Sequence, residues 1–416
     1  MADHDRTGGG LVLALKSWKV AFFSPLPPER SGIADYSAEL LPSLARWVEL
    51  ALFVSHPDQV DSRLRATFPV YPLADYGQMR WQFDIALYQM GASMYHDAMY
   101  PVLLRYGGIV TLHEYNLHRF ITTRTIPRND FVGYMREMGY ALGIEGVRWA
   151  DEIRWGRREH PLEVSLVERL LDRSQGVILH SRFAQEYVQR LRPALRTTVI
   201  PAPIGMMPEC LLTRKELGCP EDALLFVSGG HVVRSKQLPL ALEAFLRLRK
   251  EHPKVHYVIV GEELPHDFDL SGWLAAHPVE EAVTYVGYCE DLRVFYSWLA
   301  AADVVINLRS PTLGETSAVA LRALAAGRPV IVFDHGWYAE LPDDACVKVP
   351  PEDGEALLAA MRCLVMDPEK RRAIGERARR LACTEHTPAR AAERYTEFIE
   401  WVLTDSPIAL RGGGRG

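Results

Sequence analysis

The amino-acid sequence predicts an α/β fold in which two doubly wound parallel sheets face each other across a cleft. Short apolar runs alternate with helical stretches through most of the 416 residues, which is typical of parallel sheets covered by helices. These runs fall into two groups of six, separated by the proline-containing segment 200–203. Residues 304–333 read as a strand, a turn, a helix and another strand, which is half of a nucleotide-binding unit.

Each expected strand is a short apolar run bounded by polar or turn-forming residues. Because ligands bind at the carboxyl ends of parallel strands, the site is expected in the cleft between the two sheets. In the first half the expected strands are Val20–Phe23, Leu50–Val54, Ile85–Tyr88, Ile109–Leu112, Val177–Leu179 and Thr198–Ile200. In the second half they are Leu224–Val227, Tyr257–Val260, Val283–Val286, Val304–Ile306, Val330–Phe333 and Val347–Val349.

The most informative stretch follows the fourth apolar run of the second half. Gly314 breaks the chain, and Glu315, Thr316 and Ser317 begin a helix, because short hydroxyl side chains cap free N–H groups. Gly327 ends that helix. The free N–H groups and the helix dipole make such an N-terminus a binding site for anions.

This stretch resembles the donor-site segment of retaining GT-B glycosyltransferases of glycosyltransferase family 4. The family shows a Glu, seven residues, a second Glu and then Ala-Leu-Ala-x-Gly-x-Pro-Val, and residues 323–330 match that tail. Gly314 stands at the first Glu position, with Glu315 one residue later, and Arg322 stands at the second. The chain is interpreted as a variant Gly-Glu-Thr-Ser subgroup. Since the second Glu binds ribose in the family, we expect Arg322 to pair with a neighbouring carboxylate or to point away.

The loop after the first strand of the second half extends the resemblance. In the family it reads Gly-Arg-x-x-x-x-Lys, and its two cations hold the donor diphosphate. Lys236 occupies the Lys position, and His231 occupies the Arg position. Arg234 is expected to replace the missing charge, and Gly230 is assigned to the same donor site.

Two residues of the first half are assigned to the site. Gly32 begins a helix after the first strand, where the family has a glycine-containing loop that faces the donor phosphate and the acceptor. His113 follows a strand, and the matching family histidine contacts the donor sugar. The alternatives are an ordinary βα loop and a structural histidine. We expect His113 to face the cleft.

The resemblance also implies the division of the chain. The final helices would cross back to the first domain, as they do in the family. The expected parts are a loose tail (1–16), a Rossmann-like acceptor domain (17–200), a Rossmann-like donor domain (201–385), the returning helix (386–405) and a second loose tail (406–416).

Charge and composition restrict the function and the location. The net charge of -6 argues against a nucleic-acid-binding protein. No apolar run is long enough to span a bilayer, the N-terminus shows no signal-peptide pattern, and six scattered cysteines read as free thiols, so a cytoplasmic protein is expected. Residues 119–158 contain eight arginines. A solvated helical face is favoured there over an acceptor or membrane-surface patch, and peripheral membrane contact remains the alternative.

The resemblance implies a retaining transfer of sugar from a nucleotide-diphosphate sugar to a hydroxyl of a carbohydrate or lipid-linked acceptor. Glu315 would hold sugar hydroxyls, while Arg234, Lys236 and the amides of Thr316 and Ser317 would neutralise the leaving diphosphate. No cofactor and no metal are expected. The Asp-x-Asp sequence at 267–269 is the obvious carboxylate pair, but it lies in a loop that contains Pro and His and is not expected to hold a metal.

Two other functions remain open. One is a nucleotide-sugar epimerase or hydrolase on the same fold, which would turn over the donor without an acceptor. The other is a non-catalytic sugar-nucleotide-binding protein, favoured by Ala92, His231 and Arg322 at positions where the family has polar contacts. The sequence does not identify the base, the sugar, the acceptor or the oligomeric state.

Overall fold

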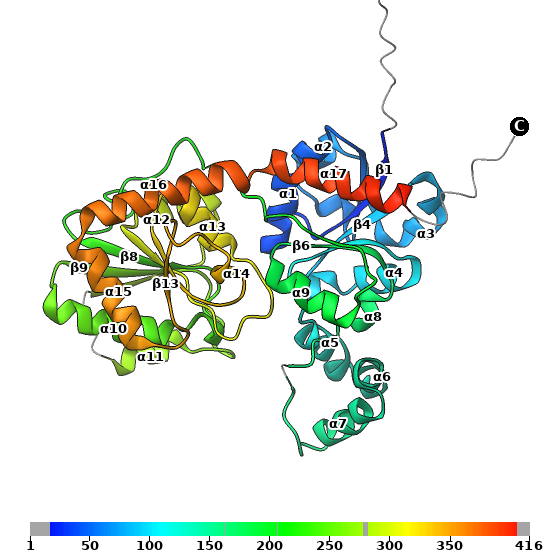
Figure 1. The fold of residues 1–416 in the computed structure, drawn as a ribbon, viewed down its shortest axis with the longest axis horizontal. Coiled ribbons are helices and arrows are strands. Elements are labelled where there is room, and N and C mark those ends of the chain that lie inside the picture. The colour runs from blue at the N-terminus through cyan, green and yellow to red at the C-terminus, as the bar shows by residue number, and fades with distance from the viewer. Residues whose placement is uncertain (1–16, 162, 206, 278–281, 406–416) are drawn as a thin grey trace, which may run out of the picture.

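The computed structural model contains two parallel-sheet domains of the Rossmann type, which confirms the predicted fold class (Figure 1). Both expected tails, 1–16 and 406–416, lie outside the part of the chain that the structure describes. The described residues are 17–161, 163–205, 207–277 and 282–405.

The N-terminal sheet has seven described strands, all paired in parallel. Six of them are the predicted ones, and the seventh, a short edge strand, was not predicted. From edge to edge they are β3 (Val70–Pro72), β2 (Glu49–Val54), β1 (Lys19–Phe23), β4 (Ile85–Met90), β5 (Gly108–Leu112), β6 (Ser174–Leu179) and β7 (Thr197–Val199).

The C-terminal sheet has six described strands, also parallel. From edge to edge they are β10 (Val283–Gly287), β9 (Val255–Val260), β8 (Leu224–Gly229), β11 (Val304–Ile306), β12 (Val330–Phe333) and β13 (Val347–Val349). Strand β8 lies between β9 and β11, so the strand order reverses there. Loops that diverge from such a point leave room for a ligand at the carboxyl edge.

Helices cover both faces of each sheet and bury its apolar strands. Those of the N-terminal half are α1 (Gly32–Leu44), α2 (Ser62–Thr67), α3 (Tyr76–Met79), α4 (Met99–Tyr106), α5 (His118–Thr125), α6 (Phe131–Leu142), α7 (Ile144–Arg154), α8 (Glu168–Leu171) and α9 (Arg182–Leu191). The later ones are α10 (Leu238–Glu251), α11 (Leu270–Ala276), α12 (Leu292–Ala301), α13 (Ala318–Ala325), α14 (Gly336–Ala339), α15 (Gly354–Met366), α16 (Pro368–Glu385) and α17 (Pro388–Thr404).

The last helix belongs to the N-terminal domain. α16 runs along the C-terminal domain, and α17 continues onto the other one, where it packs against α1 (Figure 1). The hydroxyl of Tyr395 lies 2.7 Å from that of Tyr36 and 2.8 Å from that of Thr111. At the junction of the two helices, His386 Nδ1 lies 2.8 Å from the carbonyl oxygen of Ala202 in the interdomain linker.

The two domains also contact each other directly. The backbone N–H of Tyr115 donates to the carbonyl oxygen of Leu313 at 3.1 Å. The carboxylate of Glu340 accepts the N–H groups of Arg182 and Phe183 at 3.0 and 2.8 Å, which satisfies the N-terminus of α9 from the other domain. These contacts hold the carboxyl-edge loops of the two sheets together.

Helices α6 and α7 form a hairpin that projects from the N-terminal domain (Figure 1). Two arginines of α7 and of the segment after it interact within the chain: Arg148 pairs with Glu145, and the Arg158 guanidinium lies 3.7 Å from the ring centre of Trp149. Its turn nevertheless exposes Ile144, of which 85% is accessible. None of the described helices combines the length and apolar character needed to cross a bilayer.

Candidate active site

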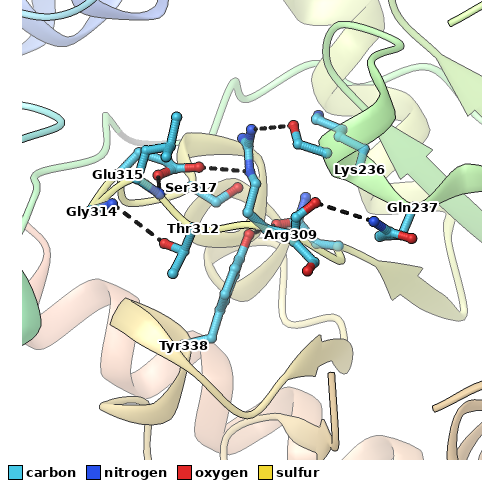
Figure 2. Close-up of polar contacts among 12 residues, drawn as sticks. Lys236, Gln237, Arg309, Thr312, Gly314, Glu315, Ser317 and Tyr338 are labelled. Atoms are coloured by element: carbon cyan, nitrogen blue, oxygen red, sulfur yellow. Dashed lines mark hydrogen bonds and ion pairs between the residues drawn. The ribbon is translucent and has the colours of Figure 1, made fainter. Parts of the chain in front are cut away.

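The loops after β8 and β11 bring Lys236, Arg309 and Glu315 together (Figure 2). Lys236 ends a short 3-10 helix, η6 (Arg234–Lys236), and its ammonium group donates a hydrogen bond to the carbonyl oxygen of Gly229, the last residue of β8. Arg309 Nε lies 3.0 Å from Glu315 Oε1, and Arg309 Nη1 donates to Ser235 Oγ at 3.1 Å. The guanidinium group therefore links the two loops.

Glu315 is fixed from a second direction as well. Its Oε2 accepts the backbone N–H of Leu313 at 2.6 Å, while its other oxygen pairs with Arg309. Ser317 caps α13 as predicted, because its hydroxyl accepts the N–H of Ala320 at 3.2 Å. Glu315 lies two residues before the N-cap of α13, and the helix dipole favours negative charge near this end.

The environment of Lys236 opposes its positive charge. Removal of the ammonium group from water, together with the nearby charge of Arg309, lowers the pKa of Lys236 to about 7. No acidic group among the described residues makes an ion pair with Lys236. A bound anion would stabilise the protonated form, and a diphosphate carries the required charge.

Two glycines are required by the close packing around this cluster. Gly230 has φ +83°, and a Cβ there would lie 2.6 Å from Lys236 Nζ. Gly314 has φ +88°, and a Cβ there would lie 2.2 Å from the ring of Tyr115 in the other domain. A side chain at either position would displace the cation or push the domain contact apart.

The N-terminus of α13 lies beside the β8 loop. Val319 is 3.1 Å from the place where a Cβ of Gly229 would stand. Thr316, expected to supply an amide to the donor, is half-buried between the loop and the helix. Parallel strand ends therefore bring a cationic loop and a helix N-terminus to the same edge of the sheet.

Arg234 is placed differently from Lys236. Its side chain is exposed and makes no hydrogen bond or ion pair within the described residues, while its backbone N–H donates to Asp267 Oδ1 at 2.8 Å. Arg309 is the arginine that contacts the Lys236 loop and Glu315. It was not predicted, although it stands three residues after the end of β11, where the carboxyl-edge rule would have found it.

Both carboxylates of the Asp-x-Asp sequence at 267–269 interact with other groups of the protein. Asp267 accepts the Arg234 N–H and lies 3.5 Å from Arg119 Nη1, and Asp269 caps α11 by accepting the N–H of Gly272 at 2.7 Å. In the described parts of the chain, no group of three or more His, Cys, Asp or Glu residues is arranged to hold a metal ion.

Arg322 pairs with a carboxylate, as predicted, and this carboxylate belongs to the other domain. Its Nη2 lies 3.2 Å from Glu39 Oε1 on α1, and its Nε donates to the hydroxyl of Tyr296 at 2.8 Å. Glu39 Oε2 also accepts the N–H of Gly205 in the linker at 2.8 Å. Position 322 therefore joins α13, α1 and the interdomain linker.

His113 and Gly32 come from the N-terminal domain. The His113 ring is half-buried, with Nε2 3.0 Å from Gln89 Oε1 and the rings of Tyr36 and His180 packed against it. Burial, reinforced by the neighbouring histidines His180 and His96, holds the pKa of His113 well below its usual range. The ring is therefore a neutral imidazole at pH 7. Gly32, the first residue of α1, is exposed, and a Cβ there would meet no atom within 4 Å.

Glu114, next to His113, was missed in the sequence. Its Oε1 accepts the backbone N–H of Ala92 at 2.7 Å. Burial raises the pKa of Glu114 to about 7, and the charge of Glu315 on the other domain adds to the effect. The available signal was its position two residues after the end of β5.

The arrangement of two facing Rossmann-like domains defines the GT-B fold. The solved structure of Anabaena Alr3699/HepE in complex with UDP shares it, with a TM-score of 0.64 at 15% identity over 92% of this chain and 99% of that one. At this identity the likeness shows the fold alone.

Residues 212–381 match the family model of glycosyl transferases group 1. The O-antigen biosynthesis glycosyltransferase WclY of Escherichia coli is 28% identical over 32% of this chain and 35% of its own length. A GDP-mannose-dependent alpha-(1-6)-phosphatidylinositol dimannoside mannosyltransferase of Mycobacterium tuberculosis is 24% identical over 60% of this chain and 66% of its own. The matches thus cover between about one third and two thirds of the length of these relatives. Together with the family model, they support glycosyltransferase activity of the group 1 type.

Proposed function

We propose that the protein is a retaining glycosyltransferase of family 4 that moves a sugar from a nucleotide-diphosphate sugar to an acceptor hydroxyl without a metal ion. The observation that carries the proposal is the meeting of Lys236, Arg309 and the N-terminus of α13 at one edge of the C-terminal sheet. The matching group 1 model covers this edge. Retention is what the family resemblance implies.

The proposed roles follow from the charges. Lys236 and Arg309 meet the negative charge that develops on the leaving diphosphate, and the α13 N-terminus adds its amides and dipole. Glu315, held by Arg309 and the Leu313 N–H, is oriented to bind hydroxyls of the transferred sugar. His113 is a neutral imidazole whose Nε2–H donates to Gln89 Oε1, so its Nδ1 can accept one hydrogen bond from that sugar. The departing phosphate takes the acceptor proton.

The direct test is binding of UDP, GDP, ADP and dTDP, measured by calorimetry between pH 6 and pH 9. An anion raises the pKa of Lys236 above its value of about 7 in the free protein. Above pH 7 binding should therefore take up a proton, and affinity should fall with rising pH by at most about tenfold per unit. Lys236→Ala should remove that proton uptake. If none of the four nucleotides binds, the proposed function is wrong.

Metal independence is a separate prediction. Because two cations and a helix N-terminus supply the positive charge, EDTA should leave turnover essentially unchanged, and added Mg²⁺ or Mn²⁺ should not raise it more than about twofold. Activity that disappears in EDTA and returns with a divalent cation would contradict the prediction and direct attention back to Asp267.

We also propose that the protein is cytoplasmic and makes peripheral contact with an anionic membrane through the α6–α7 hairpin, where a lipid-linked acceptor would be found. The supporting observation is exposed Leu142 and Ile144 at the turn, with exposed Arg136 and Arg154 on the two helices. Ile144→Glu should abolish co-sedimentation with phosphatidylglycerol vesicles, whereas Met366→Glu, at another exposed apolar position on α15, should not. Failure of the parent chain to co-sediment would contradict this proposal.

A further inference from the structure

Glu114 stands where the loops of both domains meet. The segment that follows it reaches the donor loop directly, because the Tyr115 N–H donates to the carbonyl oxygen of Leu313, two residues before Glu315. The ring of Tyr115 also covers Gly314 so closely that no Cβ fits there. Glu114 and Glu315 therefore belong to two segments in contact, one from each domain.

The N-terminal domain holds Glu114 from the opposite side. The Ala92 N–H fixes its Oε1, and a Cβ at Gly91 would lie 3.4 Å from that oxygen and 2.5 Å from Ile33 Cδ1. The start of α1, the loop after β4 and the loop after β5 thus meet around Gly91. The Ala92 hydrogen bond orients the Glu114 carboxyl group.

The two oxygens of Glu114 differ in their partners. Oε1 has the Ala92 N–H, whereas no hydrogen bond to Oε2 is found among the described residues. Because only one oxygen of this half-buried carboxyl group has a protein partner, the other oxygen is available to accept a hydrogen bond from a ligand. Its neighbours toward the C-terminal domain are Glu315 and Arg309, whose charges act on it.

We propose that Glu114 is a sugar-binding residue whose Oε2 accepts a hydrogen bond from a hydroxyl of a sugar lying between it and Glu315. This inference rests on the proposed function, since it needs a nucleotide-sugar at the Lys236–Arg309 cluster. The hydroxyl belongs either to the transferred sugar of the donor or to a sugar acceptor. The two kinds of hydroxyl have the same chemistry. In either case the site would favour a sugar that carries a hydroxyl close enough to donate to Glu114 Oε2.

Binding measurements separate the sugar from the nucleotide. The probes are the nucleoside diphosphate that the parent binds and the matching nucleotide-sugar, titrated into the parent chain and Glu114→Gln. The glutamine keeps the acceptor for the Ala92 N–H and places an NH₂ group where Oε2 stood. Glu186→Gln, at an exposed position of α9, is the matched control.

We expect Glu114→Gln to bind the nucleoside diphosphate as the parent does. If the hydroxyl is on the donor, the nucleotide-sugar should bind about tenfold or more weakly. If it is on the acceptor, nucleotide-sugar affinity should stay unchanged and the acceptor KM should rise by a similar factor. Glu186→Gln should match the parent throughout.

The inference would be overturned if the affinity for the nucleoside diphosphate, the affinity for the nucleotide-sugar and the acceptor KM were all equal in the parent and Glu114→Gln. A parallel fall in nucleoside diphosphate binding would also overturn it, because Glu114 would then act on the fold or on the nucleotide. A parent chain that binds none of the nucleotides would overturn the proposed function, and the inference with it.

Discussion

Lys236→Ala is expected to lower turnover about tenfold to a hundredfold or more. A hydrogen bond between a charged donor and a charged acceptor contributes roughly 1.5–3 kcal/mol, and this one strengthens as the leaving diphosphate gains charge. Because the same interaction exists in weaker form in the ground state, affinity for the nucleotide should fall as well. Steady-state kinetics with the preferred nucleotide-sugar would measure both effects.

The matched control is Lys254→Ala. Lys254 is a lysine of the same domain whose side chain is 81% exposed and pairs with Asp222 at the surface. Its replacement should leave kcat and KM unchanged. Arg309→Ala should resemble Lys236→Ala, because both cations meet the same ligand, and the loss should exceed that of Arg234→Ala. A Lys236→Ala protein as active as the Lys254→Ala protein would contradict the assignment of the diphosphate site.

Gly314→Ala is expected to reduce kcat/KM at least about tenfold by disturbing the contact between the domains. An alanine with positive φ costs about 1–2 kcal/mol wherever it occurs. At position 314 the methyl group would in addition meet the Tyr115 ring at 2.2 Å. The donor loop and the β5 loop must then separate, and the sugar-binding groups of the two domains would move apart.

Gly218→Ala isolates the backbone cost. Gly218 has φ +69°, and a Cβ there would meet no atom within 4 Å. It should lower the thermal unfolding midpoint by the backbone cost alone, and therefore less than Gly314→Ala does, with unchanged activity. Adding Tyr115→Ala to Gly314→Ala should restore part of the activity, since the smaller side chain makes room for the methyl group. Equal activity of the two glycine variants would refute this explanation.

The sequence predicts the strands well because both sheets are buried on two faces. Parallel strands of this kind are continuous apolar runs, and each of the twelve predicted runs overlaps a strand. The missed strand, β3, has only two apolar residues before a proline, and all three of its residues are half-buried. An edge strand is only partly buried, so its sequence need not be a continuous apolar run.

The polar residues of the site are harder to predict, because their roles depend on partners far away in the chain. Arg309 gains its place from Ser235 and Glu315, and Glu114 gains its own from Ala92 and the donor loop. Glu39 lies 283 positions before Arg322, and no local pattern relates the two. The family resemblance identifies Lys236 and Glu315 as site residues. Where this chain departs from the family pattern, the resemblance does not indicate which other residue takes over the role.

The return of α17 to the N-terminal domain affects the order in which the protein can fold during its synthesis. Ribosomes add roughly 5–20 residues per second, so about 10–40 seconds pass between residue 200 and residue 404. Through that interval the nascent first domain lacks the helix that covers α1 and contacts Tyr36 and Thr111. The N-terminal sheet domain is therefore completed after the C-terminal one, and its α1 face stays uncovered until α17 has been made.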